Sequence, residues 1–136
     1  MRNPQTFKLA SILGLAALLL CAAPLAAQDP ANPFAGQAEL AASDIPTVIE
    51  ILETAKANPT DPNALMAVYA KHGIDPMRGA YLLARASTGI GIISSGTTLE
   101  AAATTNGAAN VPSEAEFAVI KENEASLKAA MGQPAQ

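Results

Sequence analysis

The sequence predicts an all-α protein, a small bundle of four main helices that follows a cleaved signal peptide. Apolar residues recur three and four positions apart, which is the spacing of one helix face. Proline and glycine recur where these segments begin and end, as expected of helix boundaries. One stretch, residues 90–93, has strand character, but the sequence offers no second strand to pair with it.

Residues 1–27 have the three parts of a signal peptide in order. A positively charged start precedes an unbroken apolar run at 9–21, and small residues follow at 22–27. We expect cleavage after Ala27, and therefore a periplasmic or secreted protein without a stable membrane span.

Two other outcomes stay open for this segment. A retained anchor is disfavoured because the run is shorter than the roughly 20 residues of a spanning helix. Lipidation at Cys21 is disfavoured because Leu20 is larger than the residue that normally precedes a lipoprotein cysteine.

Removal of the signal changes the composition of the chain. About 109 of the 136 residues remain, with six bases against twelve acids, a formal charge of −6. The only cysteine leaves with the signal, and one histidine stays, His72. These counts exclude disulfides, a thiol nucleophile and a Cys/His zinc site, and they argue against nucleic acid as a partner.

The mature chain divides into a flexible leader at 28–42, a single helical domain at 43–131 and a disordered tail at 132–136. The first helix of the domain begins at Ser43 or Asp44, whose side chains can cap it, and ends before Pro59.

The second and third helices form a tight helical hairpin over 61–94. Asp61 or Thr60 caps the second helix, and Gly73 ends it in a left-handed conformation. Asp75 then caps a third helix that runs to about Ser94. This helix is apolar around most of its circumference, which predicts a central position.

The second half of that helix is rich in small residues, among them Ser87 and Gly91, and another helix is expected to approach it closely there. Each of its interior glycines costs about 1 kcal/mol relative to alanine, which packing must offset. Residues 97–105 form a short helix or loop, with capping-box spacing from Thr97 to Glu100. A last helix begins with a second capping box, Ser113 to Glu116.

We find no catalytic constellation in the sequence. His72 lacks the further ligands of a metal site, and Gly89-Ile90-Gly91 lacks the strand that precedes a phosphate-binding loop. Glu50 with Glu53, and Glu114 with Glu116, are interpreted as charges on outer helix faces. The sequence therefore predicts no enzyme, no cofactor and no metal.

The remaining candidate is a patch that binds a protein or a small anion. Arg78, Tyr81 and Arg85 lie close to one side of the third helix, and Tyr69 and His72 would edge the same patch.

The pattern of the mature chain resembles small exported α-helical proteins of proteobacteria whose function is uncharacterised. The stretches that carry the resemblance are Tyr69–Pro76, Gly79–Ile93 and Val111–Leu127, with Thr97–Asn110 as an insertion. The resemblance as a whole extends over about two thirds of the mature chain. The resemblance implies a helical fold and export, and no activity.

The sequence thus favours a non-enzymatic exported protein that acts through contacts with a protein partner in the cell envelope, or as an envelope accessory. The alternative is a binder of a small apolar ligand between helices near the glycine-rich part of the third helix. A membrane-surface role is disfavoured by the acidic charge. The oligomeric state is left open.

Overall fold

The computed structural model describes residues 32–134, so the predicted signal peptide at 1–27 lies outside the described residues. The all-α prediction is confirmed, because the described part of the chain forms six α-helices and no strand. The helices are α2 (Ile45–Ala57), α3 (Pro62–His72), α4 (Pro76–Ser95), α5 (Leu99–Asn106), α6 (Glu114–Glu122) and α7 (Glu124–Ala130). Two short 3-10 helices accompany them, η2 (Ala42–Asp44) and η3 (Ala108–Asn110).

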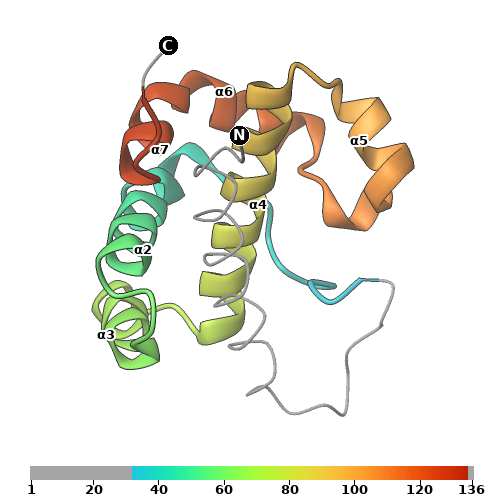
Figure 1. The fold of residues 1–136 in the computed structure, drawn as a ribbon. Helices are drawn as coiled ribbons and strands as arrows, with labels where there is room; N and C mark the ends of the chain where they lie inside the picture. The colour runs from blue at the N-terminus through green and yellow to red at the C-terminus, as the bar shows by residue number, and fades with distance from the viewer. Residues whose placement is uncertain (1–31, 135–136) are drawn as a thin grey trace.

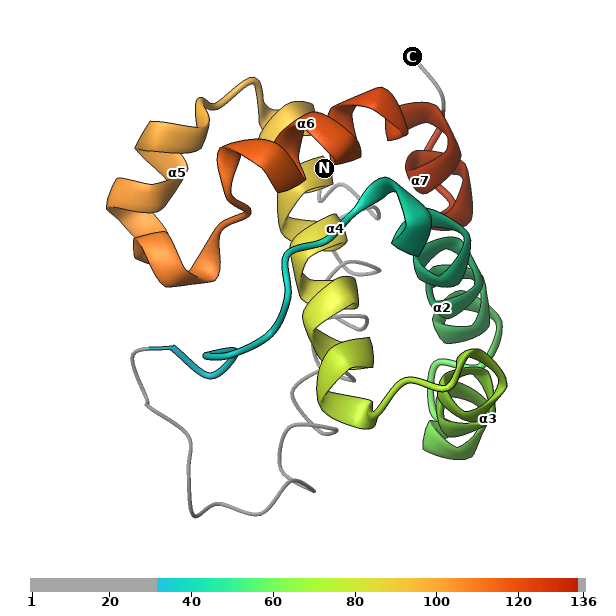
Figure 2. The ribbon, with the colours of Figure 1, turned by 180° about the vertical axis from the view of Figure 1, so that it is seen from behind.

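Helix α4 lies at the centre of the molecule, as its apolar circumference predicts. It contacts α2, α3, α6 and α7. Figure 1 shows α2, α3 and α7 on one side of α4 and α5 on the other, with α6 near the C-terminal end of α4, and Figure 2 shows the same arrangement from behind. Among the described helices, none is long and apolar enough to cross a membrane.

The boundaries of α3 and α4 follow from local capping, and the predicted caps are confirmed. The Asp61 side chain accepts from the Asn63 N–H, and the Asp75 side chain accepts from the Arg78 N–H. Gly73 ends α3 with a φ of 63°, which an L-residue with a side chain adopts only at a cost.

The starts of two helices differ from the sequence prediction. Asp44 does not cap α2, because its carboxylate accepts from the Ala41 N–H and pairs with Arg78. The cap of α5 is Thr98 rather than Thr97.

The predicted last helix is two helices, α6 and α7, which meet at Asn123. The Asn123 side chain donates to the Val119 carbonyl at 2.9 Å, which gives this residue a local alternative to the helical hydrogen-bond pattern. The tertiary structure thus replaces one straight helix by two short ones, of which α6 contacts α4 and α7 contacts both α2 and α4.

Two hydrophobic clusters hold these elements together. The larger one joins α2, α3, α4, α6 and α7, and it includes Leu40 from the segment before η2. The smaller one joins the C-terminal half of α4 to α5 and its flanks, through Ile92, Ala102 and Val111, with Leu99 and Phe117 packed against them. The α5 region is therefore attached to the domain by a small core of its own.

The glycines of α4 differ in their surroundings. A Cβ at Gly79 would overlap the ring of Tyr69, and a Cβ at Gly89 would lie 2.6 Å from Cδ1 of Ile120. A Cβ at Gly91 would meet no atom within 4 Å. The close approach expected at Gly91 occurs instead at Gly79 and Gly89, and Gly91 faces open space.

Candidate functional site

The five residues of the predicted patch lie in three different places. Tyr69 is 1% exposed, with its ring against Gly79, and its hydroxyl has no hydrogen-bond partner among the described residues. Burial raises the pKa of the Tyr69 hydroxyl to about 12. Tyr69 is therefore a core residue and does not reach the surface that Arg78 and Arg85 share.

His72 joins α3 to α2. Its Nδ1 lies 3.1 Å from the Thr47 hydroxyl, and its Nε2 lies 2.8 Å from Oε2 of Glu50. Lys71 bonds to the same carboxylate at 2.7 Å. The bond from Lys71, followed by that from His72, lowers the pKa of Glu50. Four side chains, two at the end of α3 and two on α2, thus form one polar tie between the two helices.

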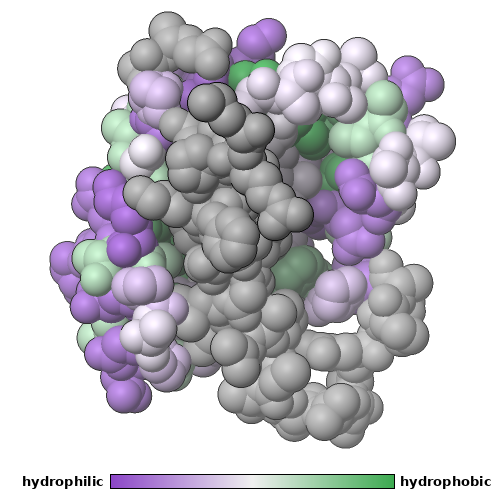
Figure 3. Space-filling view, in the orientation of Figure 1, coloured by the Kyte–Doolittle hydropathy of each residue, from purple (hydrophilic) through white to green (hydrophobic). Residues whose placement is uncertain are grey.

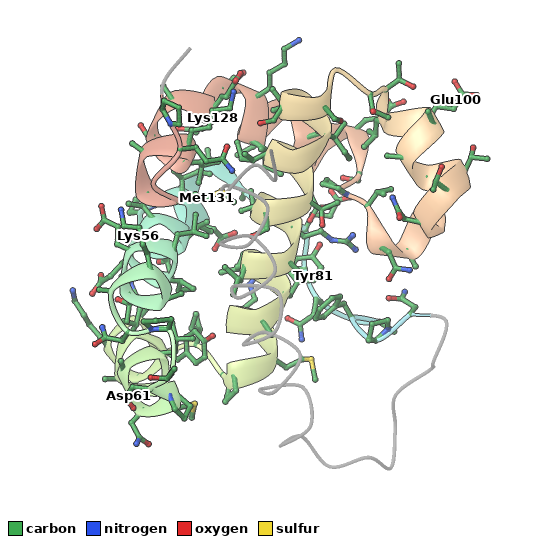
Figure 4. The ribbon with its side chains drawn as sticks, in the orientation of Figure 1. Lys56, Asp61, Tyr81, Glu100, Lys128 and Met131 are labelled. Carbon is green, nitrogen blue, oxygen red and sulfur yellow. The ribbon has the colours of Figure 1, made fainter. Side chains whose placement is uncertain are left out.

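Arg78, Tyr81 and Arg85 do lie together, along one side of α4 as their spacing predicts. The two guanidinium carbons lie 5.3 Å and 4.9 Å from the centre of the Tyr81 ring, within the range of a cation–π contact. Phe34 meets the ring edge-on, with 5.4 Å between centroids. Figure 4 shows Tyr81 on the side of α4 that faces the segment before η2.

The guanidinium groups of Arg78 and Arg85 both form hydrogen bonds with other segments of the same chain. Arg78 donates to Asp44 at 2.8 Å and to the Ala38 carbonyl. Arg85 donates to the carbonyls of Ala109, at 3.0 Å, and Val111. Their side chains are 16% and 11% exposed. The patch residues therefore hold the segments at 34–44 and 108–111 against α4, and little of either guanidinium is left for a partner.

Glu116 is the buried centre of this arrangement. Glu116 is 1% exposed, and its carboxylate accepts from the Leu40 N–H and the Ser113 N–H, each at 2.8 Å, and from the Tyr81 hydroxyl. Arg85 Nε lies 3.6 Å from its Oε2. Burial, and then the bond to Glu116, raise the pKa of the Tyr81 hydroxyl.

The interpretation of Glu116 as a charge on an outer face is wrong. Its capping box with Ser113 is present as predicted, but the sequence does not show that residues 40 and 81 close over the same carboxylate. A glutamate at the third position of a helix reaches back toward the start of that helix. That was the one local signal that its side chain points away from solvent.

A cleft of about 580 Å³ lies between the C-terminal half of α4 and α5. Ser87, Gly91 and Ile92 line it from α4, and Ala102, Thr105 and Asn106 line it from α5. Figure 3 shows apolar side chains in the hollow beside α5. The cleft adjoins the glycine-rich part of α4. The sequence predicts the ligand site there if the protein binds a small apolar ligand, which is the alternative function.

The described residues contain no group of three or more His, Cys, Asp or Glu side chains that could hold a metal ion. The chain matches no protein-family model, and no curated protein and no solved structure matches it. Function has to be argued from the chain's own geometry.

Proposed function

We propose that this protein is a non-enzymatic, exported binding protein, periplasmic or secreted, that holds a small and mainly apolar ligand in the cleft between α4 and α5. The cleft itself is the observation that carries the proposal. Its volume of about 580 Å³ falls within the roughly 300–1,000 Å³ of small-molecule sites. Its wall is built from small residues, which leave room that a larger side chain would fill.

Gly91 gives further support. A glycine inside a helix costs about 1 kcal/mol relative to alanine. At Gly79 and Gly89 that cost is offset by close packing, but at Gly91 no atom approaches within 4 Å of where a Cβ would stand. A ligand bound in the cleft would lie close to Gly91, as Tyr69 lies close to Gly79 and Ile120 to Gly89. That contact would offset the cost of a glycine at this position.

A protein partner in the cell envelope, the other function expected from the sequence, receives less support. The groups proposed to bind it, Arg78 and Arg85, are engaged within the chain. If a partner does bind there, Arg78→Ala together with Arg85→Ala should weaken its capture in a pull-down, and unchanged capture would remove this alternative.

The export of the chain, and its kinship with small exported proteobacterial helical proteins, belong to the same proposal. They are supported by the three-part sequence at 1–27 and the spacing of the helix caps. We also propose that α2, α3, α4 and the α6–α7 pair correspond to the four main helices of the predicted bundle, with α3 and α4 as its hairpin. Mass spectrometry of the mature N-terminus tests export, and we expect it to begin at Gln28.

Native mass spectrometry of protein purified without denaturant tests the binding function. We expect a bound small molecule on the wild-type chain. Gly91→Phe, whose side chain would extend into the cleft, should abolish the adduct. Ser94→Phe is the matched control, because Ser94 is exposed on α4 and does not line the cleft. An adduct that survives Gly91→Phe would place the ligand elsewhere and overturn the proposal.

A further inference from the structure

The chemistry of the cleft lining narrows the class of ligand, if the cleft is the binding site proposed above. Among the described residues that line the cleft, none is Asp, Glu, Lys, Arg or His. Removing a charge from water without a partner is costly. An ionised ligand would therefore lose hydration without gaining a charged partner in the cleft. An uncharged ligand would not incur this penalty.

Four of the seven polar side chains that line the cleft donate a hydrogen bond to a backbone carbonyl, whereas the buried Ser87 hydroxyl has no hydrogen-bond partner among the described residues. Ser95 Oγ donates to the Ile92 carbonyl at 3.0 Å, and Thr105 Oγ1 donates to the Ala101 carbonyl at 3.0 Å. The amide of Asn106 donates to the Ala102 carbonyl at 3.1 Å.

Asn110 follows the same rule, since its amide nitrogen donates to the Asn106 carbonyl at 2.8 Å. In these four side chains one donor is bound to a backbone carbonyl, each amide keeps a second N–H, and the hydroxyl or amide oxygen keeps free lone pairs. The cleft therefore offers acceptor lone pairs together with free donors, among them the Ser87 hydroxyl.

The rest of the lining is aliphatic or without a side chain. Gly91, Ile92 and Ala102 line the cleft between the polar groups, and no described aromatic residue lines it. Such a surface favours an aliphatic body, because contact with it removes methylene groups from water. It offers no ring on which a sugar or a nucleobase would stack.

We propose that the cleft takes an uncharged aliphatic compound whose polar end both donates and accepts hydrogen bonds, as the hydroxyl of an aliphatic alcohol does. The aliphatic part lies against Gly91, Ile92 and Ala102. The donor meets the free oxygens of Thr105 and Asn106.

Three probes of equal chain size test this on the mature chain: hexanol, its isomer methyl pentyl ether, and hexanoate. Binding is followed by amide chemical shifts of α4 and α5. Hexanol should bind about fivefold more tightly than the ether, because one net hydrogen bond contributes about 1 kcal/mol. Hexanoate should bind more weakly than hexanol.

The variant pair Thr105→Val with Asn106→Leu removes two of the acceptors and should bring the hexanol-to-ether ratio close to one. Thr104→Val is the matched control. Thr104 makes the same kind of bond to the carbonyl four residues before it, at 3.0 Å, but does not line the cleft. It should leave the ratio unchanged.

The outcomes separate the two proposals. If no probe binds, or if probes still bind to Gly91→Phe, the cleft is not the site and both proposals fall. If probes bind and Gly91→Phe removes them, but the ether or hexanoate binds as tightly as hexanol, only the ligand class proposed here is overturned. A ratio that survives the loss of both acceptors would overturn it as well.

Discussion

The backbone N–H of Leu40 donates to Oε1 of Glu116 at 2.8 Å, a bond between residues 76 positions apart in the chain. The same carboxylate accepts from the Tyr81 hydroxyl on α4. One buried acid therefore joins the segment before η2, the central helix and the start of α6. Phe34 and Leu40, which the sequence places in a flexible leader, pack against the core through this junction.

Loss of the Glu116 charge should destabilise the domain. Glu116→Gln keeps the shape of the side chain but turns one acceptor oxygen into an NH₂ group, which then faces a donor. Since hydrogen bonds to charged groups contribute about 1.5–3 kcal/mol, we expect the free energy of unfolding to fall by about that amount in urea denaturation.

Glu114→Gln is the control for this change, because Glu114 lies in the same first turn of α6 but is exposed. Its effect should stay below about 1 kcal/mol, the size of an exposed charge–dipole interaction. Equal effects of the two substitutions would contradict the central role of Glu116.

The glycines of α4 should respond to alanine with opposite signs. Gly91→Ala should raise the free energy of unfolding by about 1 kcal/mol, because alanine favours the helix and meets no neighbour. Gly79→Ala should lower it by about 1–3 kcal/mol, because the added methyl overlaps the Tyr69 ring in a packed core. Urea denaturation of both variants checks this, and a loss of stability in Gly91→Ala would show that its surroundings are closed.

Tyr69 should make the fold sensitive to alkali. The pKa of its hydroxyl is about 12 in the folded chain, against about 10 for an unperturbed tyrosine. Because the unfolded state loses this proton first, its contribution to stability is complete below about pH 10 and is lost as the pH rises toward 12.

Tyr69→Phe should remove that part of the alkaline loss when unfolding free energies are measured over a pH series. At neutral pH the substitution should be neutral or stabilising, since the hydroxyl it removes is buried without a partner among the described residues. Tyr81, whose pKa is also raised, stays in both chains and serves as the common background. An identical alkaline limb in both chains would refute the assignment to Tyr69.

The pKa of Glu50 reports on the polar tie that joins α2 to α3. Its pKa lies below the ordinary 4.5, with the Lys71 bond as the first cause and the His72 bond as the second. The stabilisation from this group is present above the ordinary value and is lost as the pH falls through the lowered one. In carboxyl-carbon NMR titrations, Lys71→Ala should raise the pKa of Glu50 more than His72→Ala does, and the reverse order would make His72 the main partner.

Local chemistry explains which parts of the fold were predictable. The limits of α3 and α4 depend on Asp61, Gly73 and Asp75, whose caps involve residues two to four positions away. The break at Asn123 cannot be predicted from local spacing, because residues 112–131 fit one continuous helix equally well. Sequence spacing also placed Arg78, Tyr81 and Arg85 together, since residues three, four and seven apart share a helix face.

The sequence by itself determined that this domain is helical, where its best-capped helices begin and end, and that α4 is central. Those features follow from residue type and short-range spacing. Only the tertiary structure decided that Glu116 is buried, that Arg78 and Arg85 bind the chain itself, and that Gly91 faces a cleft while Gly89 faces Ile120. The physical reason is that each of these depends on which side chain, from a distant part of the chain, comes within a few ångströms, and no helical period encodes that choice.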